Sequence, residues 1–169
     1  NVQTNTVTVY KPDDKLIKLL EKLRTQTFVP TGINLVWSVE KKKNDPLLPR
    51  VIKRFPEVDI SCVDVSEFDH GGTRRKAVEE TKCDIFVMMT QDAVPADRFL
   101  ISRLLGAFDT EGVAAAYARQ LPKAECNPAE RYTRAFNYPA ESRIKSSEDL
   151  ETMGIKAFFC SNVCAMYDR

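Results

Sequence analysis

Apolar residues follow two patterns along the chain: short unbroken runs, and stretches in which they recur every three or four positions. The first pattern is typical of buried strands and the second of amphipathic helices. The runs predict strands over residues 7–10, 33–36, 58–65, 85–89, 113–118 and 157–160. The periodic stretches predict helices over residues 46–55, 73–81 and 98–108, preceded by one that carries Leu16, Leu19, Leu20 and Leu23 behind a cap at Asp13 or Asp14.

This alternation of strands and helices predicts an α/β fold, a mainly parallel sheet with helices on both faces. After Gln120 the pattern changes, because Pro122, Pro128 and Pro139 interrupt a polar stretch, and we expect a long excursion over the sheet edge there. A charged stretch over residues 40–45 predicts a solvated loop. Ligands of open α/β sheets bind beyond the carboxyl ends of the strands, so chemistry is expected in the loops that follow them.

The 169 residues are enough for one domain with its own core. Lys and Arg number 25 and Asp and Glu 24, a balance that argues against a nucleic-acid-binding protein. No apolar run reaches the ~18 residues that span a bilayer. The chain begins at Asn1 without a visible leader, so we interpret it as a segment of a longer or processed protein.

Five cysteines and one histidine fit neither a disulfide framework nor a Cys/His zinc site, because the cysteine count is odd and no CxxC pair occurs. Cys62, Cys83 and Cys160 lie in or beside apolar runs, which predicts buried, reduced thiols and favours a cytosolic setting. Cys160 and Cys164 would share a face if that segment were helical.

A candidate anion site precedes the helix predicted at 73–81. Gly71 and Gly72 come before Thr73, the expected cap, and three cations starting at Arg74 would fill the first turn. Cations destabilise a helix N-terminus by roughly 0.3–1 kcal/mol each, so a bound phosphate would explain them. The alternative is a surface helix in which the second and third cations pair with glutamates at i,i+4. His70, the single histidine, is by itself more typical of a structural hydrogen bond than of a catalyst.

A second candidate is Asp92, which comes just after the buried strand predicted at 85–89. A carboxylate at that position suits a hard divalent cation that holds a diphosphate, and the alternative is a helix cap or turn. Arg119 and Gln120, and the polar and aromatic residues over 134–139, form sets that bind sugars or phosphates but also brace loops. The motifs of dehydrogenases, P-loop ATPases, α/β-hydrolases and zinc proteases are missing from the sequence.

Several segments in order resemble the inverting nucleotide-sugar glycosyltransferases of family two, which have the Rossmann-like GT-A fold of nucleotide-diphospho-sugar transferases. The chain is most similar to their bacterial rhamnosyltransferase branch. The resemblance covers most of the chain from about Val7 and rests on residues 67–74, 90–95, 119–122, 134–139 and 161–162.

The resemblance implies transfer of a deoxysugar, rhamnose from its dTDP derivative, onto a saccharide or lipid-linked acceptor in cell-surface polysaccharide synthesis. Asp92 falls on the metal-binding aspartate, which implies Mg²⁺ or Mn²⁺ as cofactor. The implied location is cytoplasmic, at the inner face of the membrane. The donor-binding residues expected on this basis are Pro12, Glu40, His70, Gly71, Gly72, Arg74, Gln91, Arg119 and Gln120.

The chain departs from the family in its first two loops. Asp13 and Asp14 follow Pro12, where they would repel a diphosphate, and the second strand ends in Trp37 to Glu40 in place of the family's Asp-Ser pair. A non-catalytic GT-A module for binding or scaffolding is therefore an alternative. A third possibility, an unrelated Rossmann-like nucleotide binder, would require the motif matches to be accidental. The family's catalytic base follows the acceptor region, and no catalytic residue is assigned here. We expect residues 1–169 to be the donor-binding portion, not fully active alone.

Overall fold

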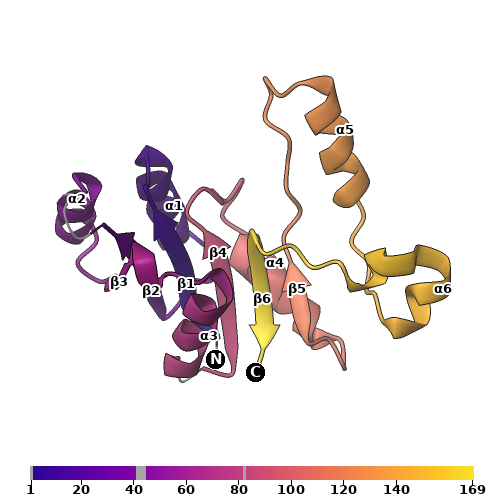
Figure 1. Ribbon diagram of the computed structural model, residues 1–169. Helices are drawn as coiled ribbons and strands as arrows, with labels where there is room; N and C mark the ends of the chain where they lie inside the picture. Colours follow the sequence, from indigo (N-terminus) through magenta and orange to yellow (C-terminus); the bar gives the residue numbers. More distant parts are fainter. Residues whose placement is uncertain (1, 41–44, 82) are drawn as a thin grey trace.

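A single mixed sheet forms the centre of the molecule in the computed structural model, which describes residues 2–40, 45–81 and 83–169 (Figure 1). The strands lie in the order β3-β2-β1-β4-β6-β5. Strands β1 to β4 are parallel, β6 is antiparallel to β4, and β5 is antiparallel to β6. The strand bounds are β1 Val2–Tyr10, β2 Gly32–Val39, β3 Asp59–Asp64, β4 Ile85–Thr90, β5 Ala115–Tyr117 and β6 Cys164–Asp168. Of the predicted charged loop, residues 41–44 lie outside the described ranges.

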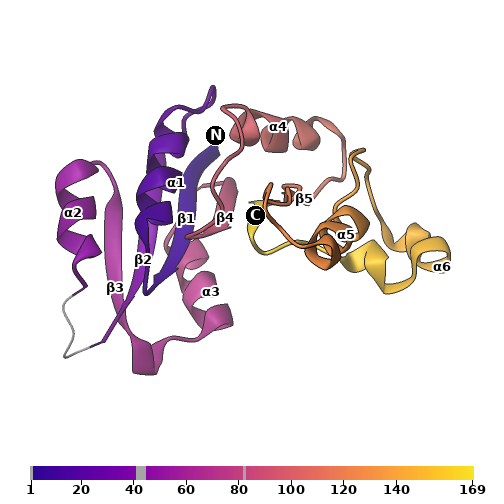
Figure 2. The same ribbon diagram turned by 90° about the horizontal axis from the view of Figure 1, so that it is seen from above.

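Helices lie on both faces of the sheet, which confirms the predicted α/β architecture. In Figure 2, α1, α2 and α4 lie on one side of the sheet and α3 on the other. Their bounds are α1 Asp14–Arg24, α2 Leu47–Arg54, α3 His70–Glu80, α4 Leu100–Gly106, α5 Pro128–Asn137 and α6 Leu150–Met153. Short 3₁₀ turns are η1 Val65–Glu67, η2 Ala107–Asp109, η3 Ser147–Asp149 and η4 Gly154–Phe158. Within the described ranges, no helix is both long and apolar enough to cross a membrane.

The main core lies between the sheet and the helices α1, α2 and α4. All four leucines predicted for α1 are buried in it, and the Asp13 carboxylate caps the helix by accepting the Lys15 N–H at 2.9 Å. Trp37 is fully buried in the same core, and its Nε1 donates to Asp45 Oδ2 at 3.0 Å. Trp37, one of the residues in which the chain departs from the family pattern, therefore packs in the core.

Helix α3 begins at His70 and not at the predicted Thr73. The helix starts there because Asp69, a residue type that strongly favours the N-cap position, caps it: the Asp69 carboxylate accepts the Gly72 N–H. A Cβ on Gly72 would lie 2.7 Å from Asp69 Oδ2, so glycine gives this cap its room. The glycines thus form the first turn of the helix, and the prediction that Arg74 and its neighbours fill that turn is wrong.

The last strand was also predicted at the wrong place. Residues 157–160 belong to η4 and the loop after it, and the pairing strand is β6. β6 buries Cys164 and its next two residues beside β4, while the Phe158 side chain is 63% exposed. Cys160 and Cys164 therefore share no helix.

The cysteines in the structure are free thiols, but their predicted burial holds only in part. Cys83 is buried as predicted. Cys160 is half-buried, and Cys62 is exposed because it lies on β3, at the edge of the sheet.

Between β5 and β6 the chain leaves the sheet and carries α5 and α6 outward, as the expected excursion does (Figure 1). Helix α5 is not among the helices predicted from the sequence. Its N-terminus has a cap at Asn127, whose side chain accepts the Glu130 N–H at 2.8 Å, and Pro128 follows the cap. Proline at that position is favourable because its missing N–H would have no helical partner.

Candidate functional site

A cavity of about 340 Å³ opens where β1, β3 and β4 end, at the carboxyl edge of the parallel strands. This is the edge at which ligands of open α/β sheets bind. The cavity is lined by Thr8, Val9, Tyr10, Val65, Phe68, Arg74, Thr90 and Gln91. Of the expected donor-binding residues it therefore collects Arg74 and Gln91.

Arg74 brings an uncompensated positive charge to this cavity from α3. Its Nε is buried and has no hydrogen-bond partner among the described residues. A buried donor without a partner costs about 1–3 kcal/mol, and more when it is charged. Nearby Tyr167 does not balance the arginine, because a phenol is neutral near pH 7 even at its ordinary pKa of about 10, and burial raises the pKa of Tyr167 further, to about 12. The arrangement suits an anionic ligand.

Gln91 forms part of the cavity wall. Its Oε1 accepts the Tyr10 backbone N–H at 2.8 Å, and its Nε2 donates to the Tyr10 carbonyl at 2.9 Å. Both ends of the amide are thus used to hold the end of β1 against the loop after β4. This gives Gln91 a bracing function at the position where a contact to the donor was expected.

Asp92 is exposed just beyond β4, next to the cavity lining. Thr90 Oγ1 donates to Asp92 Oδ1 at 2.8 Å, which orients the carboxylate. The described residues contain no cluster of three or more His, Cys, Asp or Glu side chains that could enclose a metal. A single carboxylate fits Mg²⁺ or Mn²⁺ when substrate phosphates and water supply the remaining ligands.

The first loop contacts the end of β2 through one ion pair. Lys11 Nζ lies 3.4 Å from Glu40 Oε1, beside half-buried Pro12. The Tyr10 hydroxyl and the Glu40 carboxylate raise the pKa of Lys11. Pro12 and Glu40 therefore lie at the same edge of the sheet as the cavity, although neither lines it.

The acidic residues of the first loop do not line the cavity either. Asp13 accepts the Lys15 N–H, which lowers the pKa of its carboxyl, and lies 3.4 Å from Lys15 Nζ. Asp14 pairs with Arg50 at 3.2 Å. The repulsion expected between these carboxylates and a diphosphate is thus absent from the described cavity wall.

The remaining expected residues are not among those that line this cavity. His70, Gly71 and Gly72 form the first turn of α3, where the Gly72 N–H is already bonded to the cap. Arg119 is exposed after β5. Gln120 lines a second cavity of about 350 Å³ against α5.

The fold is the GT-A fold of nucleotide-sugar glycosyltransferases. The chain superposes on a mannosyltransferase from Pyrobaculum calidifontis, solved in complex with GDP-Man and Mn²⁺, with a TM-score of 0.63 and 15% identity, over 99% of this chain and 44% of that one. S. aureus TarS 1-349 gives a TM-score of 0.60 at 14% identity, over 99% and 47%.

The chain belongs to glycosyl transferase family 2, whose family model matches residues 49–169. It is 36% identical over 152 residues to the O-antigen chain rhamnosyltransferase RfbN of Salmonella typhimurium, covering 89% of this chain and 47% of RfbN. It is 41% identical over 112 residues to the O-antigen chain rhamnosyltransferase WbaN of Salmonella anatum, covering 66% and 36%. The family and its rhamnosyltransferase relatives agree with the predicted resemblance. The chain spans less than half the length of these relatives.

Proposed function

We propose that this chain binds a nucleotide-diphospho-sugar together with a divalent cation, for transfer of rhamnose from dTDP-rhamnose to a saccharide or lipid-linked acceptor. The observation that carries the proposal is the unpartnered Arg74 Nε in a cavity whose lining includes Thr90 and Gln91, the two residues before Asp92. Two further findings support it: the relatives are O-antigen rhamnosyltransferases, and a solved protein of the same fold holds GDP-Man and Mn²⁺. The product would be a cell-surface polysaccharide, assembled at the cytoplasmic face of the membrane.

Four residues in or near the cavity are assigned distinct parts in donor binding. Arg74 donates to the diphosphate, a charge-assisted bond of the stronger kind. Asp92, oriented by Thr90, would hold Mg²⁺ or Mn²⁺, which supplies Lewis-acid stabilisation of the leaving diphosphate when bound. Tyr10 is 44% exposed at the rim and offers a ring face to the base, with Glu40 the candidate for recognising the base edge.

The non-catalytic alternative drew on the unusual residues of the first two loops. Trp37 lies in the core, and Asp13 and Asp14 are engaged with Lys15 and Arg50 outside the cavity lining. These departures leave the cavity open, which favours donor binding.

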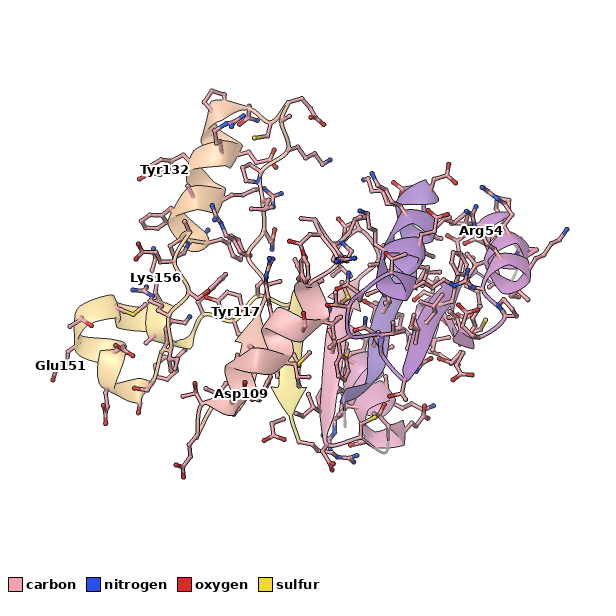
Figure 3. All side chains as sticks on the ribbon, turned by 180° about the vertical axis from the view of Figure 1, so that it is seen from behind. Arg54, Asp109, Tyr117, Tyr132, Glu151 and Lys156 are labelled. Atoms are coloured by element: carbon pink, nitrogen blue, oxygen red, sulfur yellow. The ribbon has the colours of Figure 1, made fainter. Side chains whose placement is uncertain are left out.

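Calorimetry with dTDP and Mn²⁺ tests the proposal. Asp92→Ala should abolish the dependence of dTDP binding on Mn²⁺. Arg74→Ala should weaken binding about 10–100-fold, the loss expected for a hydrogen bond to a charged group. Asp109→Ala is the matched control, because Asp109 is exposed before β5, at the opposite edge of the sheet (Figure 3). Absence of binding at millimolar dTDP, or equal binding by Asp92→Ala, would refute the proposal.

A further inference from the structure

The second cavity is lined entirely by polar side chains, from α5 and from the segments on either side of it. It measures about 350 Å³ and its lining residues are Gln120, Glu130, Thr133, Arg134, Asn137 and Tyr138. Four of them, at 120, 134, 137 and 138, belong to the Arg119–Gln120 pair and the 134–139 segment, whose sequences are typical both of sugar binding and of loop bracing.

A hydrogen-bond network centred on Gln120 fixes one wall of this cavity. Gln120 Nε2 donates to the Tyr138 hydroxyl at 2.6 Å and to Ser161 Oγ at 3.2 Å, and these two hydroxyls lie 3.0 Å apart. Gln120 Oε1 accepts from Arg134 Nη1 at 2.6 Å. Ser161 is only 4% exposed, so the network reaches into the protein. Side chains held in this way lose little conformational entropy when a ligand binds.

Aromatic rings pack against Tyr138, which belongs to the same wall. Tyr138 meets Tyr117 and Phe159 edge to face, with ring centroids 6.4 and 5.8 Å away, and Tyr117 and Phe159 are 5.7 Å apart. Tyr117 belongs to β5, so these contacts connect the wall to the sheet (Figure 3).

The charges in the second cavity cancel. Arg134 Nε donates to Glu130 Oε1 at 2.9 Å, one helical turn away, and these are the charged residues of the lining. What the lining offers is a mixture of amide, hydroxyl and carboxylate groups beside an aromatic ring. Sugar hydroxyls both donate and accept hydrogen bonds, so this lining suits an uncharged saccharide better than a phosphate.

The second cavity lies at the same end of the sheet as the first, because Gln120 follows β5 and β5 runs parallel to β4. The segment after Ser161 reaches β4 directly, because the Thr90 N–H donates to the Val163 carbonyl at 3.0 Å. β5 ends at the same edge as β4 with one strand between them, a separation on the order of 10 Å. Figure 1 shows α5 rising beyond that edge. A sugar in the second cavity would lie at the same end of the sheet as a donor held at Arg74 and Asp92.

We propose that the second cavity binds a neutral sugar unit of the acceptor. This inference rests on the proposed transferase function, and it assigns Asn137, Glu130 and Arg134 as saccharide contacts, with Gln120 as a positioning residue.

The test uses chemical-shift perturbation by methyl α-rhamnoside, methyl α-mannoside and methyl α-galactoside, each without donor, with pyrophosphate as the anionic comparison. At least one glycoside should shift resonances of α5 and of the segment around Gln120. Thr133→Arg, which fills the cavity and replaces none of the residues of the Gln120 network, should abolish those shifts. Ala135→Arg is the matched control, since Ala135 is exposed on the same helix and does not line the cavity. Asn137→Ala should weaken glycoside binding about tenfold, as expected for one lost hydrogen bond.

The donor is titrated separately, so the two proposals can fail independently. Thr133→Arg and Asn137→Ala should bind dTDP and Mn²⁺ as the unaltered protein does, and Asp92→Ala should keep its glycoside shifts. The inference is overturned if none of the glycosides perturbs α5 at tens of millimolar, if Thr133→Arg retains the shifts, or if pyrophosphate alone binds there. Loss of dTDP binding with glycoside binding intact would instead count against the donor proposal.

Discussion

Gln91 holds the end of β1 at the cavity rim, and replacing it measures that bracing function. The amide makes two hydrogen bonds to the Tyr10 backbone, at 2.8 and 2.9 Å. Each such bond contributes about 0.5–1.5 kcal/mol net, and because both are solvent-accessible we expect Gln91→Ala to lose about 1–2 kcal/mol of unfolding free energy.

Gln91→Glu separates the two bonds. The glutamate keeps an acceptor for the Tyr10 N–H but brings a carboxylate oxygen against the Tyr10 carbonyl. We expect a loss of about 1 kcal/mol at pH 7 for the missing bond. The loss should shrink below about pH 4, where a protonated carboxyl can donate again.

Urea unfolding followed by fluorescence is the assay, because Trp37 is the single tryptophan and is fully buried. Gln91→Ala should lower the midpoint by roughly 0.5–1 M at unchanged slope. Asp109→Ala, exposed at the opposite edge, should stay within about 0.5 kcal/mol of the unaltered protein. Unchanged stability of both Gln91 variants, together with weaker dTDP binding, would refute the brace and make Gln91 a ligand contact.

Three further substitutions test the fold around the site. Asp69→Ala removes the cap on the Gly72 N–H and should cost about 1 kcal/mol in thermal unfolding; an unchanged midpoint would argue against the cap. The Arg24 guanidinium lowers the pKa of Glu57 in the folded protein, so the pair stabilises the fold fully above the ordinary glutamate pKa of about 4.3 and loses that contribution as the pH falls through the folded pKa. The difference in unfolding free energy between the unaltered protein and Glu57→Gln should therefore become smaller in acid, and a difference that does not change with pH would contradict this. Asn5→Leu should raise the unfolding free energy by about 1 kcal/mol, because Asn5 Nδ2 and Oδ1 are both buried without a hydrogen-bond partner among the described residues. A lower unfolding free energy would show that the Asn5 amide does have a hydrogen-bond partner.

Local signals predicted the first half of the fold well. The cap at Asp13 and the spacing of the four leucines define α1 without reference to the rest of the chain. The position of the last strand could not be found in this way. Residues 157–160 and 164–168 are both short and rich in apolar residues, and pairing with β4, far away in sequence, selects the second. The prediction that Cys62 is buried is wrong for a related reason, since its exposure depends on β3 being an edge strand.

For the site, the sequence predicted the location better than the contacts. Strand ends converge on one edge in any parallel sheet, so Arg74 and Asp92 could be expected there. That Tyr10 and Phe68 line the cavity depends on side-chain packing between segments distant in sequence. The sequence signal for these two lining residues is only that each is an aromatic residue at or just after the end of a strand. The Gln120 to Ser161 hydrogen bond joins residues 41 apart, so neither motif alone indicates that they form one wall.

The different charge of the two cavities follows from the spacing of charged residues on two helices. On α3, Arg75 has a glutamate four residues on and pairs with it at 2.8 Å, whereas the same step from Arg74 leads to Val78. On α5, Arg134 follows Glu130 by four residues and is paired at 2.9 Å. The sequence of α5 thus gives Arg134 a neutralising glutamate, whereas the sequence of α3 places no glutamate four residues after Arg74; neither arrangement requires a ligand. If the two proposals hold, an anionic donor and a neutral acceptor would be sorted at one end of the sheet, because a diphosphate would be attracted to the first cavity and would gain little in the second.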